Sequence, residues 1–180
     1  GRHNYENAAA AMLAARLAGA PPDAIERALR SFAGLGHRAV IVRELDGVTY
    51  VDDSKATNVG AAIAALDGLA SEARRAVLIA GGVDKGGSYA PLAARMEKVG
   101  RAVVTIGQAA PLIEAALASS KLPIERATDL HDAVLRARRL ARAGDLVLLA
   151  PACSSFDMFK SYAHRGDVFV EAVRALTGGA

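Results

Sequence analysis

The sequence contains no tryptophan, and aromatic residues make up only 4% of its 180 residues. A hydrophobic core must therefore be built from aliphatic side chains, which agrees with a hydrophobic fraction of 52% and a mean hydropathy of +0.21. This apolar fraction is too high for a disordered chain. The length allows one compact domain and part of a second.

Cysteine and long apolar runs are also scarce. Cys153 is the only cysteine, so an internal disulfide framework is excluded, and a single thiol suits a reducing cytosol. The longest apolar runs, such as Leu146–Cys153, are far shorter than the roughly 20 residues that a membrane helix needs. The opening residues lack the charged and apolar regions of a signal peptide. We therefore expect a cytoplasmic protein without a membrane partner.

The sequence has only a small excess of positive charge. Its 22 lysine and arginine residues against 19 aspartate and glutamate residues give a net charge of +3. The densest basic stretch, residues 136–142, has the pattern of one face of a helix. A nucleic-acid groove needs clustered cations with interleaved aromatic residues, so we expect no nucleic-acid partner.

Two short helices are predicted at the start of the chain. Alanine dominates residues 8–17, which favours a helix, and a second helix is predicted over residues 21–32, where proline is accepted in the first turn. Because two helices alone bury little apolar surface, we interpret residues 1–34 as the end of a preceding domain, in a chain that begins with glycine instead of methionine. A glycine-containing hinge then leads to a second domain, residues 35–180.

The second domain has the pattern of an α/β fold. Two β-type runs on either side of Asp46-Gly47 predict a hairpin, because this pair favours the positive φ angles of a tight turn. Short, continuously apolar runs then alternate with helical stretches, which is typical of parallel strands covered on both faces. The sequence therefore predicts a three-layer, Rossmann-like, mostly parallel sheet with an initial β-hairpin. The expected strands cover residues 39–42, 48–51, 76–80, 102–106, 123–126 and 146–150, and the expected helices cover residues 59–70, 89–98, 109–119, 129–142 and 164–176.

Three polar segments directly follow predicted strands. They are residues 52–58, 81–87 and 151–157. Because ligands bind at the carboxyl ends of the strands in sheets of this kind, we expect the three segments to converge on one site. In the first segment, Lys55 next to a helix N-terminus suits a phosphate or carboxylate, whereas Ser54 is interpreted as a helix N-cap. In the second, Lys85 among four glycines is a candidate anion anchor, with a flexible surface loop as the alternative.

Other chemistries receive little support from the residues. Cys153 at the end of a strand is interpreted as a buried small hydrophobic residue, and the histidines lack the spacing of metal ligands. A G-x-S-x-G nucleophile motif, a G-x-G-x-x-G dinucleotide motif and a G-x-x-x-x-G-K-[ST] phosphate loop are all absent. An NAD-dependent dehydrogenase is therefore disfavoured.

Taken together, the polar segments closely resemble the Mur ligases, and in particular the branch that adds D-glutamate. The resemblance spans essentially the whole chain, including a start that is similar to the end of the family's central ATP-binding domain. The most specific segment is Asp53-Ser54-Lys55-Ala56-Thr57-Asn58. The others are Gly36-His37-Arg38, Gly81-Gly82 with Asp84-Lys85, and residues 151–159.

The resemblance implies an ATP-dependent ligase of peptidoglycan synthesis that joins D-glutamate to UDP-N-acetylmuramoyl-L-alanine through an acyl phosphate. Lys55 would be catalytic, close to the nucleotide phosphates. D-Glutamate would be held by Thr57, Lys85, Ser155 and Tyr162, the last standing where some relatives have phenylalanine. The adenine would face Asn4 and Asn7, and the ribose and phosphates would contact Arg38 and Asp53. Mg²⁺ would be bound mainly by the central domain, so no metal ligand is expected in this chain.

The resemblance also implies limits on what the chain does alone. Because the family's phosphate loop, Mg²⁺ ligands, modified lysine and uridine-binding domain are missing, we expect the isolated chain to fold without catalysing. The missing N-terminal and central domains of the same chain would be its partners, in a monomeric enzyme. One alternative is a stand-alone nucleotide- or ligand-binding α/β module. A ligase for a different amino acid, or of the related folate branch, also remains open.

Overall fold

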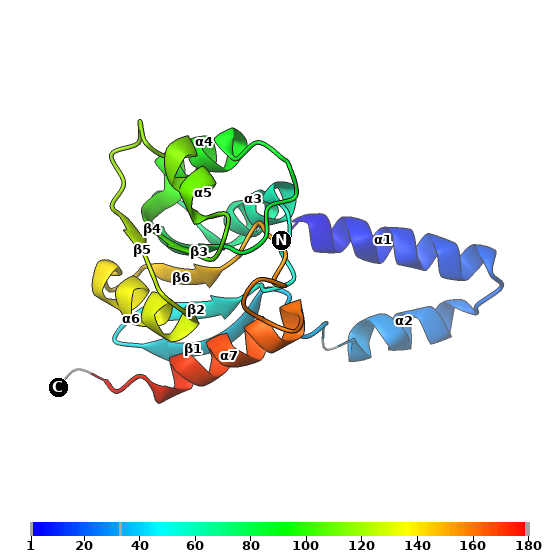
Figure 1. Ribbon diagram of the computed structural model, residues 1–180. Coiled ribbons are helices and arrows are strands. Elements are labelled where there is room, and N and C mark those ends of the chain that lie inside the picture. Colours follow the sequence, from blue (N-terminus) through cyan, green and yellow to red (C-terminus); the bar gives the residue numbers. More distant parts are fainter. Residues whose placement is uncertain (1, 33, 179–180) are drawn as a thin grey trace. The chain divides into compact units, whose positions relative to one another are not determined.

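The structure, a computed structural model, describes residues 2–32 and 34–178, with side chains from Tyr5 onward. The chain forms two compact units, Gly1–Leu35 and Gly36–Ala180 (Figure 1). The division falls in the glycine-containing segment that the sequence suggested as a hinge.

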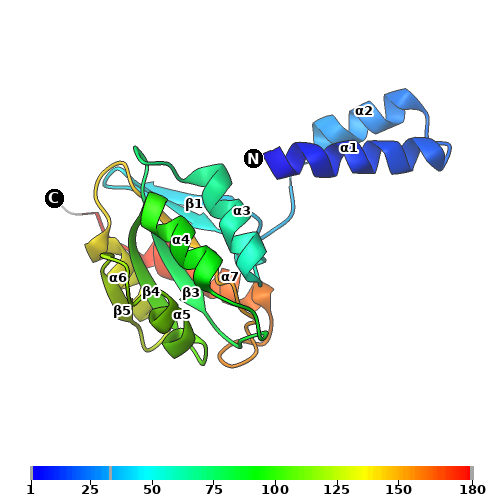
Figure 2. The same cartoon turned by 90° about the horizontal axis from the view of Figure 1, so that it is seen from above.

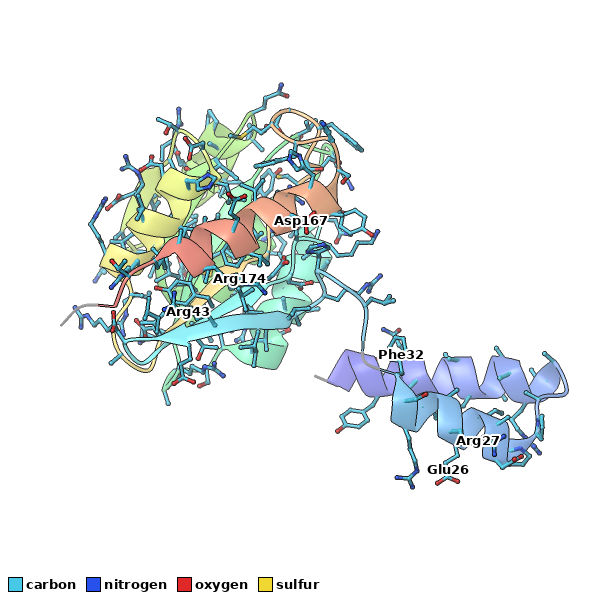
Figure 3. The ribbon with its side chains drawn as sticks, turned by 90° about the horizontal axis from the view of Figure 1, so that it is seen from below. Glu26, Arg27, Phe32, Arg43, Asp167 and Arg174 are labelled. Atoms are coloured by element: carbon cyan, nitrogen blue, oxygen red, sulfur yellow. The ribbon has the colours of Figure 1, made fainter. Side chains whose placement is uncertain are left out.

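The first unit consists of two helices, α1 (Arg2–Leu17) and α2 (Pro22–Ser31). The helix α1 starts six residues before the predicted range, and α2 carries Pro22 in its first turn as expected. Among the described residues of the two helices, only Ile25 is buried. Large apolar side chains that remain exposed include Tyr5, Met12, Leu13, Leu17, Leu29 and Phe32, the last labelled in Figure 3. This unit therefore leaves much of its apolar surface uncovered.

The second unit is built on one six-stranded sheet with the order β1-β2-β6-β3-β4-β5. β1 and β2 pair antiparallel, and every other neighbouring pair is parallel. The predicted hairpin and the mostly parallel sheet are therefore confirmed. The strands are β1 (Val40–Leu45), β2 (Val48–Asp52), β3 (Ala76–Gly81), β4 (Gly100–Ile106), β5 (Ile124–Arg126) and β6 (Leu146–Leu149).

Helices cover both faces of the sheet, so the predicted three layers are confirmed (Figures 1 and 2). One face packs against α3 (Val59–Leu69), α4 (Ala90–Val99) and α5 (Ala110–Ala116). The other face packs against α6 (Leu130–Leu140) and α7 (Tyr162–Ala175). Every residue of the central strands β3 and β6 is buried, which explains why their sequences are apolar without alternation.

Local signals in the sequence explain the hairpin and the start of α3. Asp46 and Gly47 both have positive φ, at 54° and 74°, as a tight hairpin turn requires. Asn58 caps α3, because its side chain accepts a hydrogen bond from the Ala61 amide. The expectation that Ser54 is an N-cap is therefore wrong. The helix begins five residues after Ser54, at Val59, and the Ser54 hydroxyl forms other contacts.

Several arginine side chains of the second unit are held by partners within that unit. Arg43 of β1 donates to carbonyl oxygens at the C-terminal end of α7, where the helix dipole favours a cation (Figure 3). Arg136, Arg138 and Arg139 of α6 each form an ion pair with an acidic side chain. The basic stretch at residues 136–142 thus begins on the surface of one helix, as the sequence indicated.

Candidate functional site

The strand order brings the predicted polar segments to one edge of the sheet. β6 lies between β2 and β3, and all three strands run parallel, so their carboxyl ends are neighbours. We call the segments that follow β2, β3 and β6 the first loop (residues 53–58), the second loop (residues 82–89) and the third loop (residues 150–161).

Backbone hydrogen bonds join the three loops directly. The Ala152 amide of the third loop donates to the Ala56 carbonyl of the first loop at 2.9 Å. Val83 of the second loop and Ser154 of the third exchange two backbone hydrogen bonds, with N–O distances of 2.9 and 3.1 Å. The predicted convergence of the loops is therefore confirmed.

The first and second loops meet at a lysine and a hydroxyl group. The Lys85 ammonium donates to the Thr57 hydroxyl across 3.4 Å. Lys85 is exposed and Thr57 is half-buried, so both groups are open to a ligand. A cation next to a hydroxyl group is a pair of donors suited to a carboxylate.

The second lysine of the site lies over an aromatic ring. The Lys55 ammonium is 3.8 Å from the centre of the Tyr162 ring, a cation–π contact between the first loop and the start of α7. His37 meets the same ring edge-on, with 6.3 Å between the ring centres. The Tyr162 ring thus gives Lys55 a defined position. The carbonyl oxygen of Tyr162 accepts a hydrogen bond from the Ser54 hydroxyl.

The segment before β1 is fixed beside this group. His37 Nδ1 lies 2.7 Å from an oxygen of the buried Asp52 carboxylate, and the His37 carbonyl accepts from the Lys55 amide. The close approach of His37 to α7 depends on Gly166, since a Cβ there would lie 2.1 Å from the imidazole. Arg38, the residue after His37, is exposed.

The remaining predicted site residues are placed as follows. Ser155 is buried in the third loop, and its carbonyl oxygen accepts from the Phe159 amide. Asp53 is half-buried at the start of the first loop, and its amide donates to the last residue of β6. Asn7 is exposed on α1 in the first unit, and the Asn4 side chain lies outside the described residues. The second unit therefore gathers Lys55, Thr57, Lys85, Ser155 and Tyr162 from the three loops and the start of α7.

Sequence reasoning missed the most connected side chain at this edge, Arg165 of α7. It is completely buried, and its guanidinium donates to the Ser54 hydroxyl and to the carbonyl oxygens of Ser54, Cys153 and Ser154. Burial lowers its pKa to about 10, so the side chain remains a cation at neutral pH. The helical pattern contained a signal, because Arg165 is four residues before Phe169 and shares its buried face.

A fourth segment, the turn after β4, was also missed. The Gln108 amide donates to the Asp157 carboxylate at 2.9 Å, and the Ala109 amide donates to the Gly82 carbonyl. Within the described part of the chain, the other Asp157 oxygen is buried without a hydrogen-bond partner. This turn is thereby tied to both the second and the third loop.

Cys153 of the third loop belongs to a chain of polar contacts with Tyr89 and Asp84. Its sulfur is 3.1 Å from the Tyr89 hydroxyl, which also donates to the Asp84 carboxylate at 2.7 Å. Burial raises the pKa of the Cys153 thiol, and burial likewise raises the pKa of Tyr89. Both groups therefore stay protonated at neutral pH, which argues against a cysteine nucleophile.

We expect Cys153 to be unreactive in the folded chain. Only the thiolate is nucleophilic, and the side chain is fully buried with a raised pKa. Alkylation by iodoacetamide at pH 8, followed by mass spectrometry, should be at least about 100-fold slower in native buffer than in concentrated guanidinium. Similar rates in the two conditions would contradict the buried placement of the thiol.

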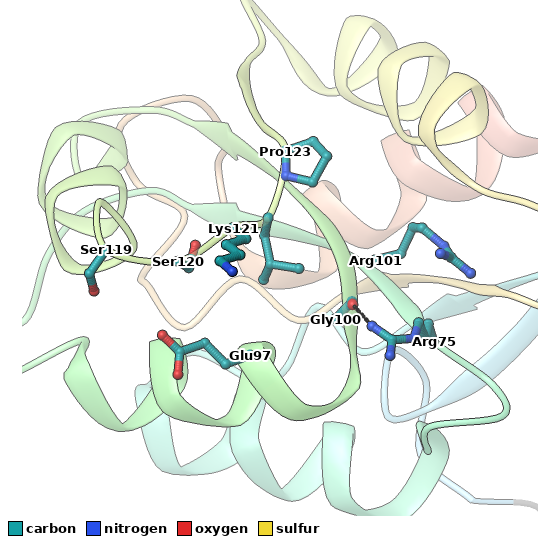
Figure 4. A pocket seen from close by; sticks show the side chains of 9 residues that line it. Arg75, Glu97, Gly100, Arg101, Ser119, Ser120, Lys121 and Pro123 are labelled. Atoms are coloured by element: carbon teal, nitrogen blue, oxygen red, sulfur yellow. Dashed lines mark hydrogen bonds between the residues drawn. The ribbon is translucent and has the colours of Figure 1, made fainter.

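A cavity of about 500 Å³ lies at the opposite edge of the sheet, where β4 begins (Figure 4). Two of its cations have fixed partners. Arg101 is paired with Asp145, and Arg75 donates to the Gly100 carbonyl. None of the predicted site residues lines this cavity, so the converging loops remain the candidate site.

Within residues 2–32 and 34–178, no group of three or more histidine, cysteine, aspartate or glutamate side chains is arranged to hold a metal ion. Across the same described residues, every helix is too short or too polar to cross a membrane.

Comparison with known proteins gives consistent matches. Residues 37–153 match the family described as "Mur ligase, glutamate ligase domain". The chain is 49% identical over 176 residues to the UDP-N-acetylmuramoylalanine--D-glutamate ligase of Chromobacterium violaceum, covering 98% of this chain and 38% of that protein. It is 51% identical over 176 residues to the ligase of the same name from Ralstonia nicotianae, covering 98% and 35%. The chain thus spans little more than a third of these curated relatives.

A solved structure supports the same fold. The Escherichia coli protein FolC, solved in complex with ADP and without folate substrate, superposes with a TM-score of 0.67 and 25% sequence identity. The match covers 94% of this chain and 40% of FolC. Both units of the chain therefore have counterparts in a larger nucleotide-binding protein.

Proposed function

The chain belongs to the Mur ligase family, as its glutamate ligase domain, and we propose that it is the C-terminal part of an enzyme that joins D-glutamate to UDP-N-acetylmuramoyl-L-alanine. The observation that carries this proposal is an identity of 49–52% to relatives with that activity in their name, over 96–98% of the chain. Such identity over nearly the whole chain favours the same amino acid over other members of the family, and over the folate branch.

The second unit would hold the amino acid. D-Glutamate carries two carboxylates, and each needs a cation or several hydrogen-bond donors when it leaves water. The contact between Lys85 and Thr57 supplies such donors, and the third loop, which pairs with the second loop at Val83 and Ser154, brings the Ser155 hydroxyl to the same edge of the sheet. We propose that the amino acid is held by Thr57, Lys85, Ser155 and Tyr162.

The nucleotide would lie on the side of Lys55 that faces away from the proposed amino-acid site. The ammonium of Lys55 is held by the Tyr162 ring and not by a carboxylate in an ion pair among the described residues, so its charge is suited to a phosphate. We propose that Lys55 takes part in catalysis near the ATP phosphates. The proposed contacts to adenine, ribose and phosphates are Asn4, Asn7, Arg38 and Asp53.

The proposed reaction has two steps. ATP transfers its terminal phosphoryl group to the carboxylate of UDP-N-acetylmuramoyl-L-alanine, which gives an acyl phosphate and ADP. The amine of D-glutamate then attacks the acyl carbon, and the tetrahedral intermediate expels phosphate and loses a proton to leave the amide. Holding the amine in line with the acyl carbon supplies much of the acceleration, and closure of the loops would keep water from the acyl phosphate. We propose that Mg²⁺ is bound mainly by the rest of the enzyme.

The first unit would be the end of a central ATP-binding domain. Its exposed apolar side chains support this assignment, because large exposed apolar residues such as Leu13, Leu17 and Phe32 are expected to pack against a larger core. We propose residues 1–34 as this fragment and residues 35–180 as the C-terminal, amino-acid-binding domain. The complete enzyme would act in the bacterial cytoplasm as a monomer.

A panel of amino acids tests the substrate. The full-length ligase that carries this sequence should release phosphate from ATP and UDP-N-acetylmuramoyl-L-alanine only when D-glutamate is added. L-Glutamate, D-aspartate, L-lysine and a folate with L-glutamate serve as controls. Turnover with one of these and not with D-glutamate would contradict the proposed substrate.

The isolated 180 residues should not catalyse the reaction. They contain no G-x-x-x-x-G-K-[ST] phosphate loop, so the terminal phosphate of ATP lacks its usual cradle. With ATP, Mg²⁺ and both substrates, we expect no sustained phosphate release above a blank without protein. Sustained release would show that the second unit activates ATP alone, and would favour a stand-alone nucleotide-binding enzyme.

A further inference from the structure

Besides the backbone hydrogen bond between Ala152 and Ala56, the first and third loops share a second buried connection, which does not itself face the proposed ligand. We propose that Ser54 and Arg165 are positioning residues that join these two loops into a single unit, so that residues on both loops keep the spacing needed to hold one amino acid. This inference rests on the proposed amino-acid site. It assigns no contact with substrate to either residue.

Ser54 is the centre of the connection. Its side chain is fully buried, its hydroxyl donates to the Tyr162 carbonyl at 2.7 Å, and it accepts from Arg165 Nε at 3.0 Å. Both functions of the hydroxyl group, as donor and as acceptor, are therefore used. A serine next to Lys55 thus ties the first loop to α7 instead of capping a helix.

Arg165 extends the connection to the third loop. One terminal nitrogen donates to the Ser54 carbonyl at 2.9 Å, and the other lies 3.2 and 3.3 Å from the carbonyl oxygens of Cys153 and Ser154. The planar guanidinium can serve two loops at once because its five N–H groups point in fixed directions. A buried cation without these acceptors is strongly unfavourable, so the carbonyl groups of both loops are held in place around it.

The connected residues are the chain neighbours of the proposed ligand residues. Ser54 directly precedes Lys55, and Ser154 directly precedes Ser155. Tyr162 also links the two groups: its carbonyl oxygen accepts the hydrogen bond from the Ser54 hydroxyl, and its ring contacts the Lys55 ammonium. Loosening the connection at Ser54 is therefore expected to displace the third loop as well as the first.

Amide hydrogen exchange on the 180-residue chain tests this coupling without activity. Removal of Arg165 risks unfolding, so the variant is Ser54→Ala, which takes away the hydroxyl and leaves the cation. We expect exchange to become about tenfold faster in residues 53–57 and also in residues 152–156. The matched control is Thr105→Val, which removes a buried hydroxyl bonded to Glu114, outside this connection. Faster exchange in the first loop alone would overturn the coupling.

Kinetics of the full-length enzyme test the consequence for the ligand. Ser54→Ala should raise the KM for D-glutamate about tenfold, since one hydrogen bond of the support is lost, and it should also lower kcat, because the displaced first loop carries Lys55. An unchanged KM for D-glutamate would overturn the positioning role. If the wild-type enzyme used another amino acid, the proposed function would be wrong. The hydrogen-exchange experiment would still show whether Ser54 couples the first and third loops.

Discussion

Replacing Lys85 with alanine in the full-length ligase should raise the KM for D-glutamate about 50-fold and the KM for ATP less than threefold. Lys85 is exposed at the mouth of the site and contacts Thr57, where a carboxylate would accept a charge-assisted hydrogen bond. Losing a hydrogen bond to a charged group costs about 1.5–3 kcal/mol, and each 1.4 kcal/mol is a factor of about ten. Initial rates with one substrate varied at a time measure both constants.

The lysine at the opposite edge gives a matched control. Lys121 is exposed and lines the cavity where β4 begins, so Lys121→Ala removes the same charge away from the three loops and should leave both constants unchanged. Lys55→Ala should instead act mainly on kcat, because Lys55 is proposed to lie near the phosphates. A larger rise in the KM for ATP than for D-glutamate in Lys85→Ala would show that the roles are assigned wrongly.

Much of the second unit could be predicted because its signals are local. The continuously apolar runs of β3 and β6 indicated buried parallel strands, and Asp46-Gly47 indicated the hairpin. The position of β6 between β2 and β3 could not be derived in this way. Strand order depends on which helices cover which face of the sheet. This is a property of the whole packed domain, and no short segment of the sequence specifies it.

The sequence predicted which loops form the candidate site, but it did not predict the buried residues that hold these loops together. Lys55, Thr57 and Lys85 stood out as polar residues after apolar strands, and the structure brings their loops together. Ser54 was misread because a serine near a helix start favours a cap, whereas Asn58 directly precedes the first helical residue. Arg165 was missed because arginine is rarely buried. Its burial depends on carbonyl groups from loops more than ten residues away in sequence.

Replacing Gly82 with alanine should destabilise the second unit by about 3–5 kcal/mol, a size reached only by severe backbone or packing defects. Gly82 has a φ of +130°, which disfavours any side chain, and a Cβ there would lie 2.0 Å from the Ser154 carbonyl oxygen. That oxygen also accepts hydrogen bonds from Val83 and Arg165. Urea unfolding of the 180-residue chain, followed by circular dichroism, measures the loss.

Gly86 and Gly87 of the same loop serve as controls, because they separate the cost of a positive φ from the cost of the contact between Gly82 and the third loop. Gly86 also has a positive φ, of +76°, but a Cβ there would meet no atom within 4 Å, so Gly86→Ala should cost about 1–2 kcal/mol. At Gly87 the space is also open and φ lies outside the left-handed region, so Gly87→Ala should change the unfolding free energy by less than about 0.5 kcal/mol. If Gly82→Ala cost no more than Gly86→Ala, the contact between the second and third loops would not require glycine. The graded series is expected because an added Cβ would collide with the third loop at Gly82 and would meet no atom within 4 Å at Gly86 or Gly87.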